Sequence, residues 1–185
     1  EDLRKRDSYW EDADKFRREK ATEFANSITA SNFQTWRERI LSYAQTRSED
    51  LATFPIFYGF LETFARAHPS LAMKLLTEDT KEIAGFHIPL LRGLWNGPEQ
   101  PALRALLDAW ITAGQYLYAS TKQFFDCPTL DRELVKRLLA RAAELNDLNT
   151  VALVMSVAAS NYRDDDSIIR ELFLPALEIL TQRGS

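Results

Sequence analysis

The sequence predicts an all-α protein, and three observations support this prediction. Apolar residues recur at the spacing of amphipathic helices from one end of the chain to the other. No segment shows the alternating pattern of a half-buried β-strand. Six glycines and seven prolines in 185 residues are too few for a loop-rich or sandwich-like fold, and 45% hydrophobic residues are typical of a globular protein. We therefore expect about ten helices joined by short connections.

Residues 1–47 are expected to form an N-terminal pair of amphipathic helices. The first helix has a stripe of apolar side chains along a highly charged segment. This stripe consists of Trp10, Ala13, Phe16, Phe24 and Ile28. Ser31 and Asn32 suit the cap of a second helix. The apolar stripe of that helix consists of Phe33, Trp36, Ile40 and Tyr43.

Residues 48–185 are expected to form further helix pairs. Ser48, Glu49 and Asp50 provide a cap and an acidic first turn for a third helix. Its aromatic-rich face consists of Leu51, Phe54, Phe57, Tyr58, Leu61, Phe64 and Ala65. The helix should end at His68 and Pro69. A short helix with Leu71, Leu75 and Leu76 follows.

A fifth helix is expected to open at a capping box formed by residues 79–82, where Asp79 and Glu82 have the required spacing. Its apolar side consists of Ile83, Phe86, His87, Leu90, Leu91 and Leu94. Pro89 lies inside this pattern and should kink or restart the helix. Gly97 and Pro98 then mark a stop and a new start.

The second half of the chain predicts five more helices. The sixth and seventh are marked by Leu103, Leu106, Leu107, Trp110 and Ile111, and by Tyr116, Leu117, Ser120 and Phe124, before a break at 127–129. The last three are marked by Leu134, Leu138, Ala142 and Leu145, by Leu148, Val151, Ala152, Met155 and Ala159, and by Ile168, Ile169, Leu172, Phe173, Ala176, Leu177 and Leu180. Asp166, at the end of a polar turn, is expected to cap the last helix.

Proline recurs beside large apolar residues early in the predicted helices, at Pro55, Pro89 and Pro175. The separations are 34 and 86 residues, and the second is roughly two repeats of about 40 to 47 residues. In this respect residues 50–184 resemble HEAT and armadillo α-helical repeats. The resemblance implies a HEAT-like α-solenoid of antiparallel helix pairs that binds partners along a concave surface, and it implies no reaction. A compact multi-helix bundle is the alternative architecture.

Composition limits the cellular setting and the class of partner. The net charge of −4 and the pI near 5.3 disfavour a general polyanion binder. The single cysteine, Cys127, excludes an internal disulfide and favours a reducing, cytoplasmic setting. We expect no membrane-spanning segment and no signal peptide. The chain starts at Glu1 within a helical pattern, so we expect either a single all-α domain over 1–185 or a segment of a larger helical-repeat protein.

The candidate reactive residues each have a structural interpretation that we prefer. His87 lies on an apolar face and is expected to be buried, and His68 should interact with carbonyls at a helix end. Cys127 follows Asp126, and a neighbouring carboxylate disfavours a thiolate nucleophile. The aspartate run 164–166 could attract a divalent cation, but a solvated turn is the stronger interpretation. We therefore predict no catalytic residue, no metal site and no cofactor.

Three functional hypotheses follow. The leading one is a non-catalytic scaffold that binds another protein or another domain of its parent chain, through a groove lined by Lys74, Glu78, Arg104 and Asp108. The second is a nucleic-acid-binding solenoid, which requires Arg132, Arg137 and Arg141 to converge on one face. The third is a helical-bundle enzyme in which His87 meets distant carboxylates.

Overall fold

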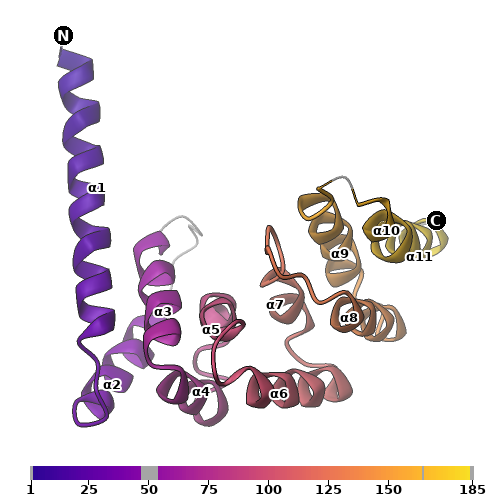
Figure 1. The fold of residues 1–185 in the computed structure, drawn as a ribbon, viewed down its shortest axis with the longest axis horizontal. Coiled ribbons are helices and arrows are strands. Elements are labelled where there is room, and N and C mark those ends of the chain that lie inside the picture. The colour runs from indigo at the N-terminus through magenta and orange to yellow at the C-terminus, as the bar shows by residue number, and fades with distance from the viewer. Residues whose placement is uncertain (1, 47–53, 164, 184–185) are drawn as a thin grey trace. The chain divides into compact units, whose positions relative to one another are not determined.

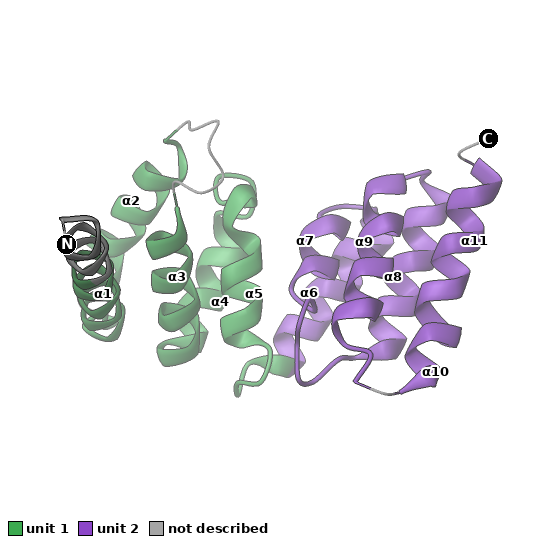
Figure 2. Cartoon of the chain, turned by 90° about the horizontal axis from the view of Figure 1, so that it is seen from above, with its two compact units in different colours: residues 1–100 green, residues 101–185 purple. Residues whose placement is uncertain are grey.

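The computed structural model describes residues 2–46, 54–163 and 165–183, with side chains described from residue 12 onward. Within these ranges the chain contains no strand, and helices account for 76% of its residues, so the all-α prediction is confirmed. The chain divides into two compact units, residues 1–100 and 101–185, which are described in turn (Figure 2). The predicted division at residue 47 and the predicted cap at 48–50 lie outside the described residues.

Unit 1 is built around one central helix, α3. The helices of this unit are α1 (Asp2–Asn26), α2 (Phe33–Ala44), α3 (Pro55–Ala67), α4 (Pro69–Glu78) and α5 (His87–Leu94), with a 3-10 turn, η2 (Ala84–Phe86), before α5. Helix α3 packs against α1, α4 and α5, and Figure 1 shows it between α1 and α5. Its buried face is formed by Phe60, Leu61, Phe64 and Ala65. Leu61, Phe64 and Ala65 belong to the face predicted for this helix, whereas Phe60 does not, and the predicted Phe57 and Tyr58 are only half-buried.

Prolines in unit 1 mark the starts of helices. Pro55 and Pro69 are the first residues of α3 and α4, and Pro89 is the third residue of α5. A proline in the first turn costs little, because the backbone N–H that it lacks would have no partner within the helix. Pro89 therefore sits where a helix restarts, which is one of the two outcomes that its position predicts.

The capping box predicted at residues 79–82 is wrong. Asp79 follows the last residue of α4, and its carboxylate accepts two hydrogen bonds from Arg37 of α2, at 2.6 and 2.7 Å. Asp79 is buried, so its charge needs a partner, and Arg37 provides a bidentate one. The pair ties α2 to the end of α4, and the fifth helix begins later, at His87.

Unit 2 is centred on α9. Its elements are α6 (Gln100–Ala113), α7 (Leu117–Lys122), α8 (Arg132–Glu144), α9 (Leu148–Ser160), α10 (Asp166–Ile168), the π-helical turn η3 (Ile169–Phe173) and α11 (Leu174–Arg183). Helix α9 packs against α7, α8 and α11. It buries Val151, Leu153, Val154, Val157 and Ala158. These side chains give unit 2 a core of its own.

Aspartates cap the helices of unit 2. The Asp131 side chain accepts from the backbone N–H of Leu134 at the start of α8. Asp147 does the same for Thr150 at the start of α9. At the last helical segment the cap is Asp165, whose carboxylate accepts from the N–H of Ser167. The prediction that Asp166 is the cap is therefore wrong by one residue, and Asp166 instead begins α10.

Candidate functional site

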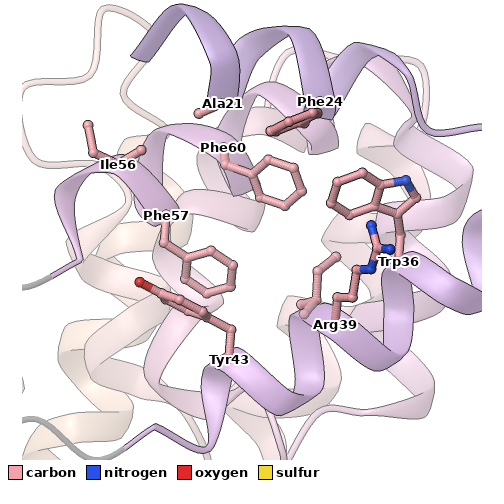
Figure 3. A pocket seen from close by; sticks show the side chains of 9 residues that line it. Ala21, Phe24, Trp36, Arg39, Tyr43, Ile56, Phe57 and Phe60 are labelled. Carbon is pink, nitrogen blue, oxygen red and sulfur yellow. The ribbon is translucent and has the colours of Figure 1, made fainter. Parts of the chain in front are cut away.

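An apolar groove lies among α1, α2 and α3 in unit 1 (Figure 3). We call it the aromatic groove. It is lined by Ala21, Phe24, Trp36, Arg39, Ile40, Tyr43, Ile56, Phe57 and Phe60. Its volume is about 270 Å³, which is enough for a few side chains and slightly below the range of about 300 to 1,000 Å³ that is typical of small-molecule pockets.

The groove follows from helical spacing on three helices. Trp36, Ile40 and Tyr43 are four and three residues apart along α2, so they lie on one face of that helix. Phe24 is three residues after Ala21 on α1, and the small Ala21 side chain leaves space beside it. In Figure 3, Phe24 lies across the groove from the α2 side chains, and the rings of α3 lie between the two helices.

Aromatic rings form a connected path along the groove. The Trp36 ring is 6.0 Å from that of Phe24 and 5.6 Å from that of Phe60. Phe60 is stacked with Phe57 at 6.0 Å, and the Phe57 ring is 4.4 Å from that of Tyr43. Ring pairs at these separations stabilise one another, so the lining of the groove is held in place.

The rings of the groove differ in exposure. Phe60, at the base, is only 7% exposed, whereas Phe24 is 49% and Tyr43 is 45% exposed. Two large rings, one on each side of the groove, are therefore about half exposed to solvent. A single exposed apolar residue is ordinary on a protein surface, whereas these two rings border the same hollow.

Two polar groups of the groove, the Arg39 guanidinium and the Trp36 indole N–H, are hydrogen-bond donors only. The guanidinium carbon of Arg39 is 5.1 Å from the centre of the Trp36 ring, within cation–π range. Among the described residues, no carboxylate lies within ion-pair distance of Arg39, and none accepts from the Trp36 indole N–H. Arginine and tryptophan side chains donate hydrogen bonds and accept none. The groove thus presents these two donor groups together with the Tyr43 hydroxyl, which can donate or accept.

The four residues predicted to line a groove are held in ion pairs. Lys74 and Glu78 pair along α4 at 3.9 Å, and Glu78 also lies 3.4 Å from Arg37. In unit 2, Arg104 pairs with the helix cap Asp131 at 2.6 Å. Asp108 also belongs to unit 2, where it pairs with Arg137 of α8 at 2.7 Å. The structure brings Lys74 and Glu78 together, whereas Arg104 and Asp108 bind different partners.

Of the two histidines, His87 is fully buried, as predicted. Its Nε2–H donates to the carbonyl oxygen of Thr80 at 2.8 Å. Burial lowers the pKa of His87, and the bond to Thr80 opposes that effect only in part. His68 lies between α3 and α4, where its ring is 6.0 Å from that of Phe64. Its Nε2 finds no hydrogen-bond partner among the described residues, so this nitrogen does not make the predicted bond to helix-end carbonyls.

The other candidate reactive residues are engaged in local contacts. The Sγ of Cys127 is 3.7 Å from the Thr129 hydroxyl. Asp165 binds Ser167 and Arg132, and these contacts lower its pKa. Asp166 accepts from the Tyr162 hydroxyl at 2.9 Å. Within the described ranges, no group of three or more histidine, cysteine or acidic side chains is placed to bind a metal ion. None of the helices described there has the length and apolar composition that crossing a membrane requires.

Five of the groove residues were predicted, but as members of the apolar stripes of their helices: Phe24, Trp36, Ile40, Tyr43 and Phe57. Phe60, the buried ring at the base of the groove, was not assigned to the apolar face predicted for its helix. The stripe pattern could not tell which members stay uncovered, since that depends on the distance between α1 and α2. One signal was available: Arg39 directly precedes Ile40 within the apolar stripe of α2.

Comparison with known proteins finds no family model, no curated protein and no solved structure that matches the chain. The function is therefore argued from the aromatic groove and the surfaces around it.

Proposed function

We propose that the chain is a non-catalytic helical module that binds another protein, or another domain of its parent chain, through the aromatic groove. The proposal rests on one observation: Phe24 and Tyr43 stand about half exposed on either side of a groove with an apolar lining. An aromatic side chain buries about 150 to 250 Å² when it is fully covered. Covering the exposed halves of both rings thus contributes on the order of 5 kcal/mol before the costs of association are subtracted.

The size of the groove supports a protein partner over a small molecule. Small ligands are usually buried over most of their surface, in pockets larger than this one. Protein interfaces instead use shallow pockets that receive one or a few anchor side chains, with the remaining contact spread over a surrounding rim. A groove of about 270 Å³ with exposed rings at its edges fits the second description.

The finer architecture that we propose is a segment of a HEAT-like α-solenoid. Its support is local: α3 and α4 are joined by the single residue His68, and α8 and α9 are joined by residues 145–147. Connections this short favour antiparallel helix pairs, which are the building units of such arrays. The prolines lend less support, because Pro55, Pro69 and Pro89 all mark helix starts whatever the repeat period.

Ion pairing in unit 2 favours a protein partner over nucleic acid. The three arginines on which the nucleic-acid hypothesis depends each bind a carboxylate: Arg132 binds Asp165, Arg137 binds Asp108, and Arg141 binds Glu144. Nucleic-acid binding draws most of its free energy from cations that neutralise phosphates. Arginines that already neutralise carboxylates contribute less to that attraction.

Site-specific photo-crosslinking tests the proposal. A photoreactive benzoylphenylalanine replaces Tyr43 in the groove or, as the control, Tyr118, which is 49% exposed in unit 2. The two variants are expressed in the organism of origin and irradiated. We expect a discrete adduct from position 43 alone, its loss when Phe24→Glu is added, and binding of the mapped partner segment, made synthetically, to the purified protein. Equal adducts from both positions, or none from position 43, would refute the proposal.

A further inference from the structure

We infer that the occupant of the aromatic groove is an amphipathic helix with an apolar face flanked by carboxylates. This inference rests on the proposed function and specifies the chemistry of the partner. Three features of the groove lead to it: the helices that form its walls, the donors on its rim, and the engagement of the nearby acidic side chains.

The walls of the groove favour a helical partner over an extended one. An extended segment binds by sharing backbone hydrogen bonds with the edge of a sheet. The groove is made of α1, α2 and α3, whose interior backbone groups already bond within each helix. A partner backbone therefore finds no row of unpaired N–H and C=O groups here. A helix satisfies its own backbone, so it can cover apolar rings without leaving buried polar groups unpaired.

The arrangement of the groove also suits a helix. Helix α3 supplies its base through Phe57 and Phe60, while α1 and α2 supply its sides, and Figure 3 shows Phe24 and Trp36 beside Phe60. A partner helix resting there would place apolar side chains at i, i+3, i+4 and i+7 against the rings. We therefore expect anchors at helical spacing.

The rim of the groove attracts negative charge. Arg39 and the Trp36 indole are both donors, as described above. On α1, Arg17 is one turn before Ala21 and thus on the same face of that helix. Arg17 is exposed, and among the described residues it has no carboxylate within ion-pair distance. Arg39 therefore lines the groove without an acidic partner, and Arg17 lies one helical turn from Ala21 of the α1 wall.

Two carboxylates of α1 already pair with cations of the same helix. Glu23 binds Lys20 at 2.6 Å, and Asp14 binds Arg18 at 3.1 Å. On α2, Glu38 accepts from the neutral Gln34 at 3.0 Å and so keeps its charge, but Glu38 is not among the residues that line the groove. The chain as a whole carries a net charge of −4, whereas the charged side chain that lines the groove, Arg39, is a cation. Carboxylates flanking the apolar face of the partner complement that surface.

The two kinds of contact have different consequences for binding. Covering the aromatic rings supplies affinity, so a charged side chain at position 24 should abolish binding. Exposed ion pairs are individually weak, so each one changes the affinity by roughly 1.5- to 5-fold. The charges therefore determine which helix binds more tightly among those whose apolar faces cover the rings. The experiment must measure this preference separately from binding itself.

Selection of peptides from a displayed library tests both the helical spacing of the apolar anchors and the preference for carboxylates. The probe is a library of helical peptides of about 20 residues with randomised faces, selected on the purified full chain and counter-selected on Phe24→Glu. Enriched sequences are synthesised with Glu, Gln or Lys flanking the apolar face, and their dissociation constants are measured by fluorescence polarisation at low salt. Tyr118→Glu is the matched control for Phe24→Glu, because the two rings are equally exposed. Circular dichroism verifies that each variant is folded.

We expect apolar anchors at helical spacing and a preference for Glu over Lys peptides of about threefold or more. This preference should persist in Arg39→Lys, weaken in Arg39→Gln and reverse in Arg39→Glu. Groove-dependent binders that prefer Lys, or that bind without helical spacing, would overturn the inference while leaving the proposed function intact. Failure to find any binder that depends on Phe24 would count against both. If the protein alone dimerises in sedimentation and Phe24→Glu makes it monomeric, the occupant is a second copy and the inference is wrong.

Discussion

At the residue scale, His87 is one of the polar residues whose side chains have no access to water. It is fully buried, its ring donates to the Thr80 carbonyl, and burial holds its pKa below the ordinary value near 6.5. The native state therefore takes up a proton on His87 less readily than the unfolded chain does. Where the unfolded state binds more protons, stability rises with pH. The stabilising effect of the neutral ring is thus fully present above pH 6.5 and is lost as the pH falls toward the native pKa.

We predict that wild-type protein loses stability between pH 7.5 and pH 5.5, and that His87→Leu loses less over the same interval. The urea midpoint measured at the two pH values in both proteins tests this. The difference between the proteins is the relevant quantity, since carboxylates elsewhere titrate in both. The same measurement on His68→Gln shows whether the pH dependence of stability comes from His87 and not from His68. Equal losses in wild type and His87→Leu would contradict the prediction.

Helix caps offer a second residue-scale test. Asp147 accepts from the Thr150 N–H at 3.1 Å and from the Thr150 hydroxyl at 2.6 Å, and Thr150 is buried. Asp147→Ala should lower the free energy of unfolding by about 1 kcal/mol, whereas Asp147→Asn should change it little, because asparagine caps nearly as well. Chemical denaturation measures both. If the alanine and asparagine variants were equally unstable, the cap would not be the source of the loss.

At the scale of elements, the close approach of α3 and α5 depends on Gly93. A Cβ built on Gly93 would lie 2.6 Å from the Cβ of Ala65 and would also meet the Glu62 carbonyl. Contacts this short require the two helices to separate. Gly93→Ala should therefore destabilise unit 1 by roughly 1 to 3 kcal/mol, even though alanine is the better helix former.

Gly59 of α3 provides the matched control for this prediction. Nothing lies within 4 Å of a Cβ at that position, and Gly59 is exposed in the helix. Gly59→Ala should stabilise the protein by about 0.5 to 1 kcal/mol, through helix propensity alone. Opposite signs for the two glycine-to-alanine changes, measured by urea denaturation, would confirm that Gly93 acts through packing. A stabilised Gly93→Ala would contradict it.

Local sequence patterns predicted the helices better than they predicted the contacts between side chains of different helices. The end of α3 at His68 and the apolar face of that helix were readable because both depend on residues within a few positions of each other. The capping box at Asp79 had the right spacing, but its carboxylate binds Arg37, 42 residues earlier in the chain. The aromatic groove escaped prediction for the same reason. Whether Phe24 is covered depends on its distance from α2, which helical periodicity does not encode.

At the scale of the whole molecule, the two units bury separate sets of side chains. Phe64 of α3 is fully buried in unit 1, and Val154 of α9 is fully buried in unit 2. The proposed partner site lies entirely within unit 1, whereas the ion pairs of Arg104 and Asp108 lie entirely within unit 2. A change in one core can therefore be followed separately from the other.

This separation predicts how a core substitution spreads. Gly93→Ala strains the contact between α3 and α5, so amide hydrogen exchange should accelerate in α3, α4 and α5. Leu138 of α8 is fully buried in unit 2, and Leu138→Ala should cost about 2 to 5 kcal/mol and accelerate exchange in α8 and α9. Exchange followed by mass spectrometry, peptide by peptide, tests both variants in the full chain. Each unit should respond mainly to its own substitution, because the side chains that lose contacts belong to that unit.

Uniform acceleration of exchange in both units by either variant would mean that the units unfold as one cooperative structure. A binding event at the aromatic groove would then stabilise unit 2 as strongly as unit 1.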